Sequence, residues 1–187
     1  MSARWRPWLA TAAVLLTTVA LLRLEGRLWW CKCGSPALWI SDAWGPHTSQ
    51  HLFDPYSFSH IVHGVLFAGL AWLVLRRRPF AWQFCLALAI ECFWEVVENT
   101  NTVIARFRAA TAAVGYEGDA VANSFGDILA AALGAALAHR IGWRWSIVFV
   151  LANELVLLVW IRDSLLLNIV MLIYPIDAIR VWQAAGR

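Results

Sequence analysis

Residues 57–75 read SFSHIVHGVLFAGLAWLVL, and this stretch decides the fold class because it is apolar almost throughout. An α-helix of this length rises about 28 Å, close to the thickness of the hydrocarbon core of a bilayer. The sequence RRRP at 76–79 follows directly and ends the apolar run with three positive charges. The stretch therefore predicts a transmembrane helix that ends at a charged turn.

The rest of the chain continues this pattern. Of its 187 residues 61% are hydrophobic and only 14% are charged, against about 25% charged in a soluble domain. Hydropathy predicts six transmembrane helices, over residues 7–24, 57–75, 79–103, 119–138, 145–161 and 164–181. We expect one integral membrane domain over residues 1–187, an all-α polytopic helix bundle in contact with the lipid bilayer. The net charge of +3 is scattered, so nucleic acid is not indicated as a partner.

The distribution of lysine and arginine predicts the orientation of the bundle. Positive residues are enriched in cytoplasmic loops. With the N-terminus inside, nine basic residues lie inside and six outside, and the compact turn Arg76–Arg78 adds to this bias. Both termini are therefore predicted to be cytoplasmic, with the loops 25–56 and 105–118 facing outward. The alternative, a cleaved signal peptide, is disfavoured because no small-x-small cleavage site follows Leu22.

Ionisable residues recur inside the predicted spans, where each costs about 2.5–3.5 kcal/mol on insertion scales and usually marks function. Three glutamates share one face of the span 79–103, and an aspartate, an asparagine and an aspartate share one face of the span 119–138. Two histidines lie one turn apart at the start of the span 57–75. Most of these residues lie at one level, roughly 5–12 Å below the outer surface, and Glu91 lies deeper. The set is Glu91, Glu95, Glu98, Asp119, Asn123, Asp127, His60 and His63, with Glu154 and Asn168 at a depth comparable to that level.

Three interpretations of these residues remain open. The first is a site for a divalent metal such as Zn²⁺, since histidine and carboxylate ligands suit such ions. The second is a proton or ion relay, and the third is a purely structural network that holds the bundle together. In the metal interpretation the ion activates water for hydrolysis. The expected ligands are His60, His63, Glu95, Asp119 and Asp127, and the expected catalytic groups are Glu91 or Glu98 as general base together with Asn123.

The outer loop 25–56 carries its own polar side chains. Cys31 and Cys33 form a C-x-C motif that indicates a redox or metal role, because a disulfide between them would close a very strained ring. His47 and His51 follow, and the loop ends directly above His60. The loop is interpreted either as a lid over the polar residues or as an ordinary interfacial loop.

Two further features bear on packing. Cys85 and Cys92 lie inside an apolar span and are expected to be core residues. Gly126, Ala130 and Gly134 form a small-xxx-small pattern, which lets a second helix approach closely. This pattern is expected to serve packing within the chain, with dimerisation as the alternative.

Several longer motifs occur along the chain: CKCG (31–34), SQHL (49–52), YSFSHIVHG (56–64), WEVVEN (94–99), GYEGDAVANS (115–124), WIRDSLLLNIVMLIYPIDAI (160–179) and VWQA (181–184). Together they resemble an uncharacterised bacterial family of multi-pass inner-membrane proteins. The resemblance covers about residues 25–184 and implies a membrane protein of the bacterial inner membrane without an assigned activity. A looser similarity, limited to the spans 79–103 and 119–138, is to the VanZ-like membrane proteins associated with glycopeptide resistance.

The leading hypothesis is thus an outward-facing intramembrane site that binds metal and hydrolyses a lipid-linked or periplasmic molecule. The alternative is a non-enzymatic accessory subunit, acting as a homo-oligomer or within a larger membrane complex, or a proton or ion transporter. No repeat relates the two halves of the chain, which disfavours the transporter.

Overall fold

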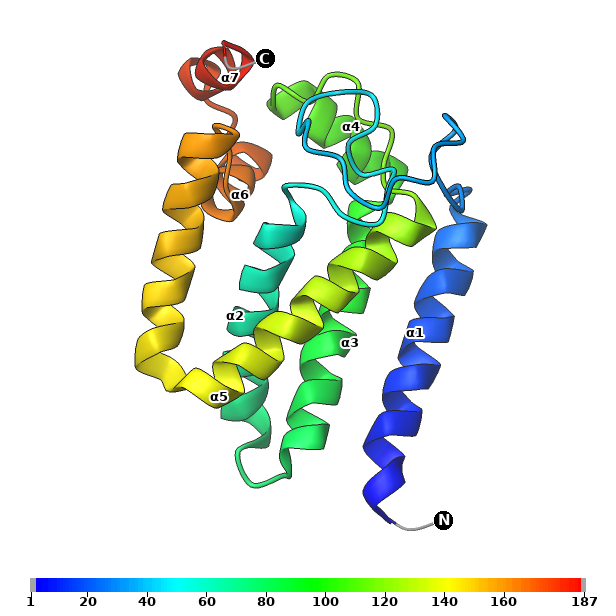
Figure 1. Cartoon of the computed structure of the whole chain (residues 1–187), viewed down its shortest axis with the longest axis vertical. Helices are drawn as coiled ribbons and strands as arrows, with labels where there is room; N and C mark the ends of the chain where they lie inside the picture. Colours follow the sequence, from blue (N-terminus) through cyan, green and yellow to red (C-terminus); the bar gives the residue numbers. More distant parts are fainter. Residues whose placement is uncertain (1–2, 186–187) are drawn as a thin grey trace.

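Seven α-helices and a short 3-10 helix, η1, make up the computed structural model, which describes residues 3–185 (Figure 1). The described residues form no β-strand beyond one isolated bridge between Trp39 and Phe53, so the all-α prediction is confirmed. Four helices, α1, α2, α3 and α5, are long and apolar enough to cross a membrane. The elements are η1 Ala3–Trp5, α1 Arg6–Leu24, α2 Ser57–Leu75, α3 Phe80–Glu98, α4 Asn101–Ala110, α5 Val121–Trp160, α6 Leu165–Ile173 and α7 Asp177–Ala184.

The predicted helix 79–103 is two helices in the structure. α3 ends at Glu98, and α4 begins at Asn101 after a break at Thr100, whose backbone is extended. The Thr100 hydroxyl accepts a hydrogen bond from the Val103 amide at 3.4 Å, an N-cap that starts a new helix in a new direction. Residues 99–102 read Asn-Thr-Asn-Thr, and the prediction carried the span through this polar run to Val103.

The predicted helices 119–138 and 145–161 are instead the two legs of α5. The legs, 121–141 and 143–160, meet at Gly142, whose φ of 74° and ψ of 170° are not helical. A positive φ is accessible to glycine because it has no Cβ atom. Figure 1 shows the two legs as a V whose vertex lies at the same end of the molecule as the start of α1.

The predicted sixth span, 164–181, is broken into α6 and α7, of nine and eight residues. Pro175 causes the break because it has no amide proton and disfavours helical backbone at Tyr174, which is extended. Neither piece has the roughly 20 residues that a bilayer requires. The count of six spans is therefore not confirmed. Nor is the placement of both ends on one side, because α1 begins at one end of the bundle and α7 lies at the other (Figure 1).

Glycines bring α2 and the first leg of α5 into backbone contact. A Cβ atom at Gly134 would overlap the Ile61 carbonyl, and one at Gly64 would overlap the Ala131 carbonyl. Gly126 approaches the Leu52 carbonyl in the same way. The small-xxx-small pattern of α5 therefore serves packing within the chain, as predicted.

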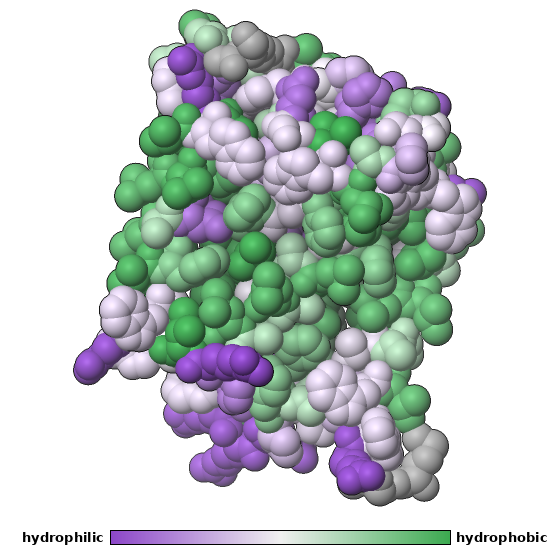
Figure 2. All heavy atoms as spheres, in the orientation of Figure 1, coloured by the Kyte–Doolittle hydropathy of each residue, from purple (hydrophilic) through white to green (hydrophobic). Residues whose placement is uncertain are grey.

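The surface of the molecule is divided into bands. Figure 2 shows hydrophobic side chains across the middle and hydrophilic ones at the two ends, the distribution that a bilayer favours. Exposed tryptophans lie near both ends of the bundle, as is typical of membrane–water interfaces. By their places on the elements, those at the end where α1 begins include Trp5, Trp8, Trp72, Trp143 and Trp145, and those at the other end include Trp29, Trp39 and Trp160.

Candidate functional site

Polar side chains from three helices converge at one end of the bundle, where α2 begins, α3 ends and α5 begins (Figure 1). Loop 25–56 covers this end and supplies backbone carbonyls to the start of α5. Leu28 accepts a hydrogen bond from the Val121 amide at 2.7 Å, and Ser49 accepts one from the Ala120 amide at 2.8 Å. These bonds satisfy helix N–H groups that have no partner within the helix. We refer to His60, His63, Glu91, Glu95, Glu98 and Asp127 as the His60 cluster.

Glu91 joins the two histidines of this cluster. One carboxylate oxygen lies 2.5 Å from His60 Nδ1 and the other lies 3.1 Å from His63 Nδ1. Glu91 has no solvent exposure, so these short contacts form in a low-dielectric interior, where charge-assisted hydrogen bonds are strong. Glu91 thereby holds both imidazole rings in fixed orientations.

His60 is the hub of the cluster. Its Nδ1 atom lies 3.3 Å from Glu95 Oε1, and its Nε2 atom lies 3.9 Å from Asp127 Oδ2. Asp127 also accepts a hydrogen bond from the Ser57 hydroxyl at 2.8 Å. Two overlapping sets of residues could each hold a metal ion, because the donor atoms within each set lie within 4.8 Å of one another. The sets are His60, His63 and Glu91, and His60, Glu95 and Glu98.

Several polar atoms of this region are buried without a hydrogen-bond partner. Both oxygens of Glu95 and both polar atoms of the Asn123 side chain are in this state, as is one oxygen of Glu98. Among the described residues no lysine or arginine forms an ion pair with any carboxylate of the His60 cluster. With all four carboxylates ionised, the cluster would carry more negative charge than its two histidines could balance, and a bound cation would compensate the difference.

Asp119 belongs to a neighbouring network rather than to either donor set. It accepts hydrogen bonds from Asn99 Nδ2 and from the Tyr116 hydroxyl, both at 2.8 Å. Burial raises the pKa of Asp119, and burial beside Asp119 and Glu98 raises the pKa of Tyr116, which keeps the phenol protonated as a donor. Sequence reasoning missed Asn99 and Tyr116, although both lie in the motifs WEVVEN and GYEGDAVANS.

Glu154, predicted as a supporting group at the same depth, caps α6 instead. Its two oxygens accept hydrogen bonds from the Leu165 and Leu166 amides at 3.1 and 2.9 Å. Asp163 nearby accepts a hydrogen bond from the Tyr56 hydroxyl at 3.0 Å, and burial raises its pKa to about 7. The spacing of Glu154 along the chain gave no information about this partner.

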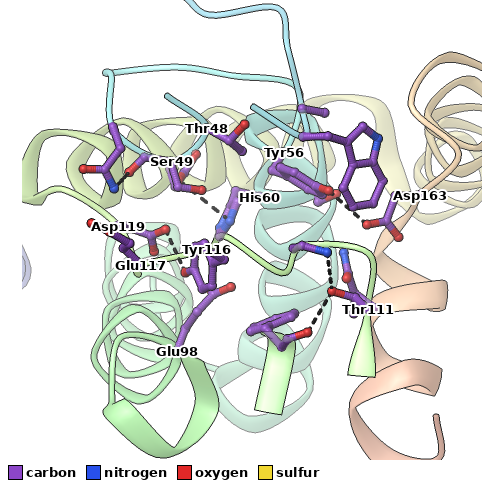
Figure 3. A pocket seen from close by; sticks show the side chains of 18 of the residues that line it. Thr48, Ser49, Tyr56, His60, Glu98, Thr111, Tyr116, Glu117, Asp119 and Asp163 are labelled. Atoms are coloured by element: carbon purple, nitrogen blue, oxygen red, sulfur yellow. Dashed lines mark hydrogen bonds and ion pairs between the residues drawn. The ribbon is translucent and has the colours of Figure 1, made fainter. Parts of the chain in front are cut away.

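A cavity of about 780 Å³ opens beside the cluster and has walls of two kinds. Figure 3 shows His60, Glu98 and Asp119 facing the cavity, with Tyr116 beside them. Side chains of loop 25–56, from Cys31 to Tyr56, line the cavity from above, which fits the predicted lid. The apolar wall includes Leu66, Phe67, Trp94, Phe107, Ile169 and Leu172.

Comparison with known proteins identifies relatives over almost the whole chain. A family model described as "Protein of unknown function (DUF2585)" matches residues 22–185. A UPF0314 protein of Paracoccus denitrificans is 41% identical over 97% of this chain and 94% of its own length. Another, of Rhizobium meliloti, is 43% identical over 94% of this chain and 89% of its own length. No solved structure matches the chain.

Proposed function

The chain belongs to the DUF2585 family of bacterial proteins, and we propose that it is a metalloenzyme embedded in the inner membrane. It crosses the membrane several times and binds a divalent ion such as Zn²⁺ between α2, α3 and α5. Its reaction is hydrolysis of a lipid-linked or periplasmic molecule that enters the cavity beside the ion.

Glu95 is the observation that carries the proposal. Its carboxylate has no solvent exposure and no hydrogen-bond donor, and the carboxylates of Glu91, Glu98 and Asp127 surround the same histidine. An ionised carboxylate buried in this way costs several kcal/mol unless a cation compensates it. A divalent ion bound by Glu95 and His60 would supply that compensation, and Glu98 lies close to both without being required as a ligand.

In this proposal Glu91 positions the histidines and Glu98 acts as the base. Glu91 contacts both histidines and acts as a positioning residue, because metal-binding imidazoles need a fixed orientation. A bound divalent ion supplies a water molecule acidified for attack near neutral pH. Glu98 lines the cavity and has one carboxylate oxygen without a partner, so it is the general base that takes the proton from that water.

The cavity favours an amphiphilic substrate. Its polar floor accommodates a hydrated headgroup, while the apolar wall of Leu66, Phe67 and Trp94 accommodates a hydrocarbon chain. Pockets of this size enclose molecules of roughly drug-like dimensions. Lipid-linked molecules combine both properties and reach such a cavity from the bilayer.

A transmembrane proton relay has less support. Between the His60 cluster and the Arg76–Arg78 turn, the buried side chains of α2, α3 and α5 are mainly apolar. A relay requires a chain of polar groups or water through this layer. The layer is formed by Leu88, Cys92, Ile128 and Ala131 and, further from the cluster, by Ala71, Ala87 and Ala135.

Elemental analysis of detergent-purified protein tests metal binding. We expect His60→Ala and Glu95→Gln to lose about one equivalent of divalent metal relative to the wild type. His139→Ala is the matched control, because His139 is exposed and stacks on Phe80 away from the cluster. Equal metal contents in all four proteins would refute the proposal.

Hydrolysis is then tested with vesicles of a bacterial total lipid extract. Metal-loaded wild-type protein is expected to release water-soluble products, and chelation or Glu98→Gln is expected to abolish the release. Metal-loaded protein that releases no more product than the Glu98→Gln variant would contradict hydrolysis of these lipids while leaving metal binding intact.

A further inference from the structure

A second group of metal-ligating side chains lies in loop 25–56, separate from the His60 cluster. Cys31 Sγ lies 3.3 Å from His47 Nδ1, and Cys33 Sγ lies 3.6 Å from His51 Nε2. All four ligand atoms lie within 4.8 Å of one another. Both cysteines are free thiols, so neither is consumed by a disulfide. We call these four residues the loop site.

The spacing of these atoms matches a tetrahedral zinc centre. With Zn–S bonds of about 2.3 Å and Zn–N bonds of about 2.05 Å, a tetrahedron places sulfur and nitrogen roughly 3.5 Å apart. The two measured sulfur–nitrogen distances, 3.3 and 3.6 Å, lie on either side of this value. The same atoms therefore need little rearrangement to surround one ion.

Further contacts of His51 and Cys31 also favour metal binding. His51 Nδ1 lies 2.6 Å from the carbonyl oxygen of Ala37, so Nδ1 carries the proton and the Nε2 lone pair faces Cys33. The His51 side chain is almost fully buried and meets the edge of the Trp30 ring. The Cys33 amide lies 3.3 Å from Cys31 Sγ and donates to it. These contacts orient one imidazole and one sulfur before any ion arrives.

We propose that Cys31, Cys33, His47 and His51 bind a Zn²⁺ ion that fastens loop 25–56 over the cavity. Two thiolates and two imidazoles are a donor set typical of structural zinc, whereas the His60 cluster offers only nitrogen and oxygen. Cys33 and His47 are exposed, which gives the ion a path from the aqueous side.

The position of the loop site gives the ion a structural role. Ser49 and Gln50, adjacent to His51, bind the start of α5 through the Ala120 amide and the Gly118 carbonyl. Lys32, between the two cysteines, pairs with Glu117 at 2.7 Å. An ion that joins residue 31 to residue 51 therefore closes a loop already attached to residues 117–120 beside the cavity. Its loss frees the lid without removing any residue of the His60 cluster.

Cobalt substitution tests this proposal, because Co²⁺ bound by thiolates absorbs in the near ultraviolet whereas Co²⁺ bound only by nitrogen and oxygen does not. The full-length protein is purified in detergent under reducing conditions, stripped with a chelator and titrated with Co²⁺ and then Zn²⁺. We expect the wild type to develop the thiolate band at about one equivalent and to lose it when Zn²⁺ is added.

Four variants localise the signal. Cys33→Ala and His51→Ala are expected to lose the band and about one equivalent of Zn²⁺. Cys85→Ala, which removes a buried thiol of α3, and His60→Ala are expected to keep the band. Absence of a thiolate band in reduced wild-type protein would overturn the proposal, as would its persistence in Cys33→Ala. Because His60→Ala affects only the intramembrane cluster, failure of one metal site is distinguishable from failure of the other.

Discussion

The effect of Glu95 on the stability of the fold depends on whether a cation is bound to its carboxylate. The carboxylate is fully buried, has no hydrogen-bond donor and lies 3.3 Å from His60 Nδ1. Without a cation it destabilises the fold, because a buried charge or an unpaired polar group costs free energy. With a cation it becomes a ligand. The two states predict opposite effects of the same substitution.

We predict that Glu95→Gln stabilises the protein when chelator is present and loses the stabilisation that metal provides. At a metal concentration of about 100 times Kd, the wild type gains roughly 2.7 kcal/mol of unfolding free energy. The variant gains much less because a neutral amide is a poor ligand. Thermal unfolding in detergent, with chelator and then with Zn²⁺, measures both effects.

Asp177→Asn is the matched control for this experiment. Asp177 lies at the start of α7 and pairs with Arg180 on the surface, where ion pairs contribute about 0–1 kcal/mol. It is expected to leave the Tm and its response to metal nearly unchanged. A Glu95→Gln variant that is less stable than the wild type under both conditions would assign Glu95 a structural role.

The contact between α2 and α5 depends on glycines at particular positions. Gly64 and Gly69 lie on the same helix, but only Gly64 meets the α5 backbone, at the Ala131 carbonyl. No atom lies within 4 Å of a Cβ atom built at Gly69. The two positions therefore separate the intrinsic cost of glycine in a helix from its role in packing.

We predict that Gly64→Ala lowers stability by about 1–3 kcal/mol, because the helices must move apart. Gly69→Ala is expected to be neutral or to raise stability by about 0.5–1 kcal/mol through helix propensity. The Tm of each purified variant provides the comparison. Equal effects at the two positions would show that the close contact of α2 with α5 is not required.

The elements of the carboxyl-terminal third depend on local backbone chemistry as much as on hydropathy. Gly142 turns α5 back on itself, and Pro175 separates α6 from α7. Residues 164–181 are apolar enough to resemble a span, yet the missing amide of one proline divides them. Glu154 then caps α6 by accepting two of its first amide protons.

The two ends of the molecule carry different residues, and the orientation of the protein in the membrane can therefore be measured by labelling each end. The end that carries Arg76–Arg78 is predicted to be cytoplasmic, and the end covered by loop 25–56 is predicted to face outward. Cys33 is exposed in that loop and supplies a native thiol for labelling.

We predict that a membrane-impermeant maleimide labels Cys33 in intact spheroplasts, with chelator present to free the thiol. In a triple variant that carries Cys31→Ala, Cys33→Ala and Arg77→Cys, the new thiol at position 77 is expected to react only after the membrane is disrupted. Labelling of the Arg77→Cys variant in intact spheroplasts would reverse the predicted orientation and place the cavity on the cytoplasmic side.

Much of the candidate site was accessible from sequence because helical periodicity is a local property. Glu91, Glu95 and Glu98 lie at spacings that share a helix face, and the structure turns that face toward His60. Asn99 was missed because its contact with Asp119, 20 residues away, depends on the path of the chain through α4, which no local pattern encodes. Tyr116 lies only 3 residues from Asp119, but in a segment without the helical periodicity on which the prediction relied.

The sequence by itself determined the all-α fold class, the presence of several apolar helices and which residues are too polar for a bilayer interior, because each follows from hydropathy and a repeat of about 3.6 residues. Only the tertiary structure decided which of those residues meet. It placed Asp127 beside His60, removed Glu154 from the cluster and brought Cys31 within reach of His47. The position of Glu154 depends on the turn at Gly142, and the contact of Cys31 with His47 depends on the path of loop 25–56, because a helical repeat encodes neither of these backbone conformations.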